Sequence, residues 1–211
     1  MSKFDKLKEA VHKGREDESM EIAKDLIAKG VNVQELLEVI GSGMRTSSEK
    51  LLNGEYSPAE VLVSIDAFRA VRDLLAQSAK KEEISPSGRI LIGTIAGNVH
   101  QTGKILVGAL LESEGFEVVD LGENVSRDDF ISKTFDLVPD ILVLACYTFN
   151  AQGELKNLLK DFEKSGLRSN LKIIIGGHST SQVFAEQIGA DAWAANPLDT
   201  VSVAKMLMNR K

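Results

Sequence analysis

The sequence predicts an α/β protein in which a four-helix bundle precedes a doubly wound parallel sheet of five strands, of flavodoxin or Rossmann type. The first observation is that residues 1–80 carry apolar side chains at helical spacing throughout. The second is that short apolar runs alternate five times with helical segments from Arg89 onward. A chain of 211 residues that is 43% hydrophobic is also long enough to bury two small cores.

The helical half is predicted from apolar spacing and from capping residues. In the first helix the apolar stripe consists of Phe4, Leu7 and Val11. The third segment, residues 33–56, keeps a helical period despite two glycines. A fourth helix begins at Ser57 as N-cap, with Glu60 three residues later, the spacing of a capping box. Four helices with short connections predict an antiparallel bundle, which we place at residues 1–80 as a cap domain.

The second half is predicted to be a separate domain, residues 89–211, joined to the bundle by a linker at 81–88. The linker combines a charge run with Ser, Pro and Gly. Because each apolar run is followed by a helix, the strands form a parallel sheet covered on both faces. A ligand of such a sheet lies beyond the carboxyl ends of its strands. Those ends are residues 94–103, 121–124, 145–150, 176–180 and 194–197.

Charge and cysteine content narrow the class of protein. A net charge of −6 with acids and bases interspersed argues against nucleic acid as a partner, because a phosphate-binding face needs clustered Lys and Arg. The single cysteine, Cys146, excludes an internal disulfide framework and fits a reducing compartment. Residues 1–14 are too charged for a signal peptide, and no apolar run reaches membrane-spanning length. We therefore expect a soluble, cytoplasmic protein whose partners are proteins or small molecules.

The turn after the first strand, GNVHQTGKI, is not a phosphate-binding loop. Five residues separate Gly97 from Gly103 where a P-loop has four, and Ile105 stands where Ser or Thr must reach magnesium. A phosphoacceptor receiver domain is also excluded, because it needs an acidic cluster after the first strand. The chain has Gly93 and Thr94 there.

His100 is the residue of this turn whose side chain can bind a metal or transfer a proton. A loop histidine taken alone is more often a surface or capping residue than a ligand. Asn98 lies two residues earlier, where its side chain can hydrogen-bond one ring nitrogen and direct the other at a metal. Gly97 and Gly103 leave the backbone open to close approach by a large group. His100 is therefore a candidate metal ligand.

Three segments of the chain resemble a known protein family. Residues 93–122 resemble the cobalamin-binding motif of corrinoid proteins and of methionine synthase modules, in which the turn reads Asp-x-His-x-x-Gly. In that family the histidine is the lower axial ligand of cobalt, and the matching positions here are Asn98, His100 and Gly103. Residues 54–68 resemble the helical cap of methyl-carrying corrinoid proteins. Residues 173–193 resemble the fourth strand with its paired glycines, which border the slot for the nucleotide tail of the cofactor.

Two departures from the family pattern affect what the resemblance implies. Asn98 stands where the family has Asp, which predicts a weaker cobalt–histidine bond and easier access to the His-off state. The third strand ends in Ala145, Cys146 and Tyr147 where the family commonly has Ser-x-Leu. Loss of the Ser hydroxyl removes one hydrogen bond to the tail, about 1 kcal/mol. Two alternatives stay open. Either the hydroxyl of Thr148, or those of Ser179 and Thr180, replaces the missing hydrogen bond, or the corrinoid carries a different lower base.

The resemblance implies a cobalamin site with His100 as the metal ligand. Its cofactor-binding residues are Gly97, Asn98, Val99, His100, Gly103, Ala145, Tyr147, Thr148, Gly176, Gly177 and His178. Three further residues have ordinary interpretations. Cys146 is predicted to be a small core residue, His12 a solvated residue on a polar helical face, and Lys104 either a solvated helix-start lysine or a cation that steers phosphate or amide groups of the cofactor.

By this resemblance the chain is a methyl-carrier subunit, active only with its partners, of a corrinoid-dependent methyltransferase or O-demethylase system. It would accept a methyl group on Co(I) from a donor-specific methyltransferase and pass it to a second methyltransferase with a tetrahydrofolate or thiol acceptor, with a reductive activator as a further partner. Aromatic methyl ethers, which we slightly favour, methylamines and methanol all remain open as donors. The alternatives are a cobalamin-dependent sensor or storage protein and, less favoured, the cofactor subunit of a mutase.

Overall fold

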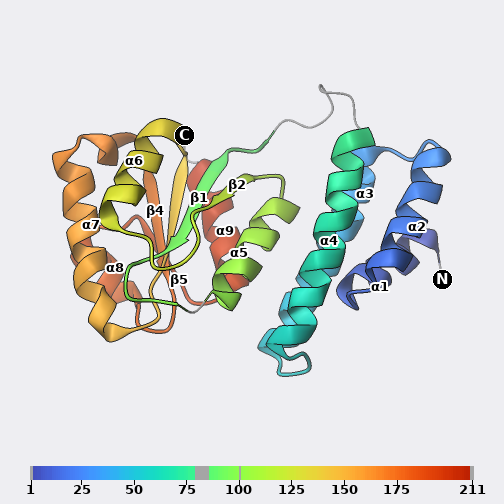
Figure 1. Cartoon of the computed structure of the whole chain (residues 1–211), viewed down its shortest axis with the longest axis horizontal. Coiled ribbons are helices and arrows are strands. Elements are labelled where there is room, and N and C mark those ends of the chain that lie inside the picture. The colour runs from blue at the N-terminus through green and yellow to red at the C-terminus, as the bar shows by residue number, and fades with distance from the viewer. Residues whose placement is uncertain (1, 79–85, 100, 210–211) are drawn as a thin grey trace. The chain divides into compact units, whose positions relative to one another are not determined.

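The computed structural model describes residues 2–78, 86–99 and 101–209 (Figure 1). The chain divides into a helical unit, Met1–Pro86 together with Glu112–Gly115, and an α/β unit, Ser87–Leu111 with Phe116–Lys211. The four N-terminal helices and the five-stranded parallel sheet confirm the predicted fold class. The proposed boundaries, with a linker at 81–88, stay a prediction because residues 79–85 lie outside the described part of the chain.

The helical unit is built from capped helices that pack through a shared apolar core. Its helices are α1 (Lys3–His12), α2 (Glu16–Ala28), α3 (Val33–Leu52) and α4 (Pro58–Ser78). The predicted capping box begins α4: the Ser57 amide donates to Glu60 Oε2 at 2.7 Å, and the Glu60 amide donates to Ser57 Oγ at 3.3 Å. Gly43 lets α3 lie close to α1, because a Cβ there would come within 3.1 Å of Val11 and the Lys8 carbonyl.

His12 is not the solvated residue that the sequence predicts. It is partly buried, and its Nδ1 lies 3.0 Å from the Tyr56 hydroxyl, with the two rings stacked. Burial lowers the pKa of His12 below its usual value. The backbone carbonyl of His12 also accepts hydrogen bonds from the Ser64 and Ser47 hydroxyls, at 2.7 and 3.3 Å. The end of α1 is therefore held by polar contacts that the sequence pattern did not reveal.

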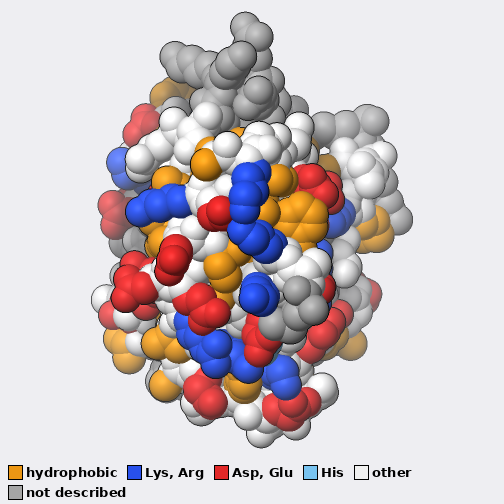
Figure 2. Space-filling view, turned by 90° about the vertical axis from the view of Figure 1, so that its right-hand side faces the viewer, with side chains coloured by type: hydrophobic (Ala, Val, Ile, Leu, Met, Phe, Trp, Pro, Cys, Tyr) orange, Lys and Arg blue, Asp and Glu red, His pale blue; other side chains and the backbone are white. Residues whose placement is uncertain are grey.

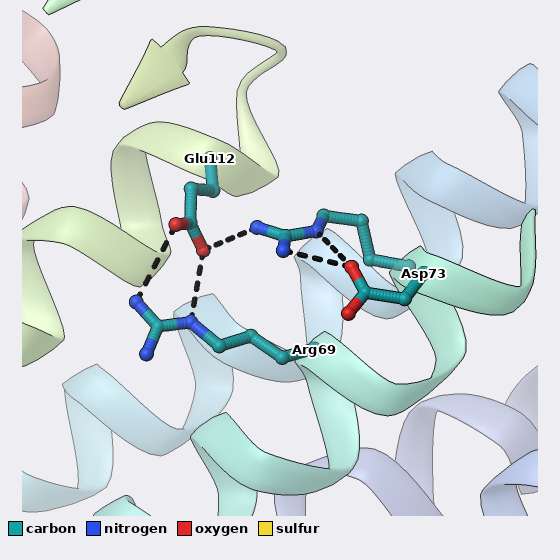
Figure 3. A network of polar contacts seen from close by, with 4 residues as sticks. Arg69, Asp73 and Glu112 are labelled. Atoms are coloured by element: carbon teal, nitrogen blue, oxygen red, sulfur yellow. Dashed lines mark hydrogen bonds and ion pairs between the residues drawn. The ribbon is translucent and has the colours of Figure 1, made fainter. Parts of the chain in front are cut away.

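Charged side chains of the helical unit gather around one carboxylate, that of Glu112 (Figure 3). Glu112 Oε2 accepts from Arg69 Nε at 3.1 Å and pairs with an Arg72 guanidinium nitrogen at 2.6 Å. Arg72 in turn donates to Asp73 Oδ1 at 2.8 Å. The Glu112 side chain is only 13% exposed, so its charge is compensated by two guanidinium groups where water reaches it poorly.

Acidic and basic side chains are interspersed on the face of the molecule shown in Figure 2, with apolar side chains between them. In the helical unit, for example, Asp25 pairs with both Lys3 and Lys29. Such mixing gives this face no large field of one sign. Among the described residues, no helix has the length and apolar character needed to cross a bilayer.

The α/β unit is a parallel sheet in the order β2-β1-β3-β4-β5, the flavodoxin-like order. Its strands are β1 (Arg89–Thr94), β2 (Glu117–Asp120), β3 (Ile141–Ala145), β4 (Lys172–Gly176) and β5 (Ala192–Ala194). Its helices are α5 (Thr102–Ser113), α6 (Arg127–Leu137), α7 (Gln152–Lys164), α8 (Gln182–Ile188) and α9 (Pro197–Met208), with short 3₁₀ turns η1 (Phe149–Ala151) and η2 (Leu167–Asn170).

Helices cover both faces of the sheet, as the continuous apolar strands predict. Figure 1 shows α6, α7 and α8 on one side and α5 and α9 on the other. One core lies under α6, α7 and α8, where Phe130, Leu155 and Phe162 pack against Leu142 and Ile173 of the central strands. Because the chain leaves β1 and β3 in opposite directions across the sheet, their carboxyl ends form the switch point at which this fold binds ligands.

Val138 closes α6 in a left-handed conformation, with φ 45° and ψ 59°. Its amide caps the helix by donating to the Thr134 carbonyl at 3.0 Å, and 76% of the residue is exposed. A β-branched residue is disfavoured in this region of φ/ψ space, whereas glycine adopts it freely.

We predict that Val138→Gly stabilises the α/β unit by about 1 kcal/mol, because it removes left-handed strain while losing little burial. Urea unfolding followed by the fluorescence of Trp193, the single tryptophan, measures the change. Val138→Ala is the control, since it keeps the Cβ that causes the strain. An equal gain in the alanine variant would show that the strain is not the cause.

Candidate functional site

The main cavity of the α/β unit lies where the sheet topology places a ligand, at the carboxyl ends of β1, β3, β4 and β5. Its volume is about 460 Å³, and its walls include the first turns of α5 and α9. A second, more open hollow of about 540 Å³ is lined by Val99, the start of α5, Tyr147 and His178. Gly103, Tyr147 and His178 line both spaces, so the two adjoin.

The structure brings most of the predicted site residues to these two spaces. Ala145, Gly176 and Gly177 line the main cavity and Val99 lines the hollow. Gly97, Asn98 and Thr148 lie in the surrounding loops without lining either space. His100, the predicted metal ligand, lies outside the described residues. Its role therefore stays a prediction.

The turn before His100 is held by hydrogen bonds to its backbone. Gly97 has a φ of 85°, and its amide donates to Asn124 Oδ1 at 2.8 Å. Asn98 is fully buried. Its Oδ1 accepts from the backbone amides of Tyr147 and Thr148 at 2.8 and 3.0 Å, and its Nδ2 donates to the Ile95 carbonyl at 3.1 Å.

The sequence did not predict these backbone contacts of Asn98. We expected the side chain to orient the imidazole of His100, and that role stays a prediction because His100 lies outside the described residues. Sequence reasoning included Asn124 in the strand end at 121–124 but gave it no role. The available signal was its position directly after the second strand, in a conformation with φ 52° that asparagine tolerates better than most residues.

Tyr147 stands at the junction of the two spaces, against the start of α5. Its hydroxyl accepts a hydrogen bond from the Lys104 backbone amide, and a Cβ at Gly103 would lie only 2.8 Å from that oxygen. A side chain at Gly103 would therefore require the phenol to shift away from the helix. Burial raises the pKa of Tyr147 above its usual value, so the phenol remains protonated at neutral pH.

Lys104 is neither a solvated lysine nor an unpaired cation available to steer phosphate. Its side chain is 1% exposed and its ammonium is paired with both carboxylate oxygens of Asp120, at the end of β2. Asp120 Oδ1 also accepts from the Gly122 amide at 2.8 Å. The burial follows from the position of Lys104 on the inner side of α5, where the side chain crosses to the neighbouring strand.

The paired glycines allow the end of β4 to lie against the end of β3. Gly177 has a φ of 106°, and a Cβ there would lie 2.3 Å from the Cys146 carbonyl oxygen, a distance no side chain tolerates. At Gly176 a Cβ would lie 3.3 Å from the Ala194 carbonyl. His178, which follows them, is exposed. Gly177 is needed to form this part of the cavity wall, and a side chain at Gly176 would fit tightly.

The hydroxyl groups near β3 have defined partners, which bears on the missing Ser at position 145. Ser179 Oγ donates to the Cys146 carbonyl at 2.9 Å and lies 3.2 Å from its sulfur. Thr180 Oγ1 donates to the Gly177 carbonyl at 2.7 Å and accepts from Trp193 Nε1 at 3.0 Å. Of the proposed compensating residues only Thr180 lines the main cavity. Cys146 is buried, which raises its thiol pKa, as expected for a core residue.

Comparison with known proteins identifies the kind of domain that contains this cavity. Residues 88–202 match a family model described as a B12 binding domain, and residues 3–76 match a second model of the same description. The chain is 29% identical to a corrinoid protein of Desulfitobacterium hafniense (strain Y51), covering 100% of this chain and 99% of that one. It is 32% identical to dimethylamine corrinoid protein 3 of Methanosarcina acetivorans, over 98% and 91% of the two chains.

Solved structures agree with these matches. A cobalamin-binding protein from Desulfitobacterium hafniense DCB-2 superposes with a TM-score of 0.76 at 26% identity, covering 97% of this chain and 98% of that one. The methanol:cobalamin methyltransferase complex of Methanosarcina barkeri contains the same fold, with a TM-score of 0.84 at 20% identity over 99% of this chain and 80% of that one. The predicted cobalamin cofactor is thereby confirmed at the level of the domain.

We predict that Asp120→Ala lowers the free energy of unfolding by about 3 kcal/mol, because it leaves the buried Lys104 ammonium without its counter-charge. Lys104→Met is the matched variant, since it removes the charge and keeps much of the side-chain volume. The double variant should recover part of the loss. Urea unfolding of the three proteins measures this, and an Asp120→Ala effect below that of Lys104→Met would contradict it.

Proposed function

Because the chain belongs to the B12-binding corrinoid proteins, we propose that it is the methyl-carrying subunit of a multi-protein methyltransferase system. It accepts a methyl group on Co(I) from a donor-specific methyltransferase and passes it to a second methyltransferase that uses tetrahydrofolate or a thiol. The observation that carries the proposal is a preformed cavity at the switch point of a B12-binding domain. Near full-length similarity to trimethylamine and dimethylamine corrinoid proteins supports it.

The residues present fit a corrinoid. When bound, the corrinoid would supply a cobalt centre that carries the methyl group. Gly97 and Gly103 place no side chain on the turn after β1, which leaves its backbone accessible to a ligand. Gly176 and Gly177 line the main cavity without side chains, and we assign that cavity to the nucleotide tail. Tyr147 and Thr180 place hydroxyl groups at that wall in place of the missing serine. His100 is the residue we assign as the lower ligand of cobalt.

The methyl donor is set by the partner methyltransferase. Because the relatives include trimethylamine and dimethylamine corrinoid proteins, these two amines are the first methyl donors to test. Methanol and aromatic methyl ethers follow as alternative donor classes. The partners we propose are one methyltransferase for the donor, one for the acceptor and a reductive activator.

We predict that hydroxocobalamin binds stoichiometrically to the purified protein and that its Co(II) form shows nitrogen superhyperfine structure in electron paramagnetic resonance. His100→Ala should lose this structure, because an imidazole nitrogen bonded to cobalt produces it. His178→Ala is the control, since His178 lines the more open hollow and is not the assigned ligand. Loss in the control instead of in His100→Ala would reassign the ligand, and absence of binding would reject the site.

We further predict that the loaded, reduced protein takes an isotopically labelled methyl group from methyl iodide and gives it up to tetrahydrofolate or a thiol only when an acceptor methyltransferase is added. A carrier must hold the methyl group until a partner removes it. The label in the acceptor is the measurement. A storage protein would release intact cofactor and transfer no label with any acceptor methyltransferase, which would contradict the carrier role.

A further inference from the structure

Two asparagine side chains join the ends of three neighbouring strands beneath the cofactor site. Asn98 follows β1, Asn124 follows β2, and the backbone groups that Asn98 binds, those of Tyr147 and Thr148, follow β3. Asn98 is 0% exposed, so each of its hydrogen bonds is made without competition from water. Tyr147 lines both the main cavity and the adjoining hollow.

The partners of Asn98 require a carboxamide. The oxygen faces two backbone N–H donors, at 2.8 and 3.0 Å, and the nitrogen faces one carbonyl, that of Ile95, at 3.1 Å. The asparagine carboxamide supplies both the acceptor and the donor that these groups need. An aspartate would satisfy the two donors equally well but would place its second oxygen against the Ile95 carbonyl. The departure from the family's Asp thus matches the local structure.

Asn124 fixes the two residues that precede Val99. Its Oδ1 accepts from the Gly97 amide at 2.8 Å, and its own amide donates to the Asn98 carbonyl at 3.1 Å. Together with the Ile95–Val125 bridge, these bonds attach the turn to the end of β2. The chain from Ile95 to Asn98 ends two residues before His100. It is therefore held from two sides, by the segments that follow β2 and β3.

We propose that Asn98 and Asn124 are positioning residues that fix the turn leading into His100 and tie it, through Asn98, to the Tyr147 loop at the cavity. The proposal rests on the proposed function, because it takes His100 as the cobalt ligand. In this chain Asn98 acts on the backbone of two loops, those that follow β1 and β3. Occupation of the main cavity and placement of the ligand turn are thereby coupled through one side chain.

The first test is amide hydrogen exchange of the corrinoid-free protein. Asn98→Ala should raise the exchange rates of the Tyr147 and Thr148 amides by about tenfold, the change that loss of one ordinary hydrogen bond produces. Asn124→Ala should raise that of the Gly97 amide. Asn150→Ala is the control, because Asn150 is exposed in the same loop and should leave all three rates unchanged. Unchanged rates in both variants would overturn the proposal.

The second test is the Co(II) spectrum of Asn98→Asp. If Asn98 positions backbone, the aspartate variant should show a smaller His-ligated fraction than the wild type, since its second oxygen repels the Ile95 carbonyl. If Asn98 is a ring partner of His100, aspartate should increase that fraction, which would overturn the proposal. Asn124→Ala, at an exposed position, should also reduce the fraction. It keeps the test decisive should a variant at the buried position fail to fold.

The two tests separate this proposal from the proposed function. A wild-type protein that binds hydroxocobalamin without nitrogen superhyperfine structure would reject His100 as ligand, and amide exchange would then decide the loop contacts alone. A wild type with that structure, together with variants that retain it and exchange normally, would reject the positioning role while leaving the methyl carrier intact.

Discussion

The buried carboxamide of Asn98 is the contact on which the arrangement of the strand ends depends. It joins the turn after β1 to backbone groups 49 and 50 residues away, after β3. A short side chain can do this because parallel strands end at the same edge of the sheet, and β1 and β3 are neighbours there. A buried backbone amide left without an acceptor costs about 1–3 kcal/mol, so the loop conformation is strongly favoured over alternatives that break these bonds.

The cavity follows from how closely backbone segments approach around this contact. Gly177 lies against the Cys146 carbonyl and leaves no room for a side chain, and Gly103 lies against the Tyr147 hydroxyl. The space enclosed is therefore shaped by main chain at Gly177 and by the ring of Tyr147 at Gly103. Because Gly177 excludes a Cβ, main chain fixes that part of the wall before a ligand arrives.

The electrostatics of the cavity wall are those of a site for a large ligand held by shape and by neutral polar groups. Lys104 is neutralised by Asp120, and the phenol of Tyr147 is kept protonated by burial. The hydroxyl of Thr180 is held by Trp193 and by the Gly177 carbonyl. A preorganised wall of this kind places its hydrogen-bonding groups without the ordering cost that flexible side chains would incur on binding.

Local patterns in the sequence determined the order of helices and strands, the capping of α4 by Ser57 and Glu60, and the location of the ligand at the strand ends. These depend on residues close together in the chain, and the glycines and the turn around His100 could be recognised for the same reason. Only the tertiary structure decided which groups those residues touch. Three of these contacts join residues 16 to 50 positions apart: the bonds of Asn98 to Tyr147 and Thr148, the pairing of Lys104 with Asp120 and the bond between His12 and Tyr56. Hydrophobic periodicity places a residue on a face of its own helix or strand, but polar pairing across that distance is set by how the strands align and how closely the loops pack.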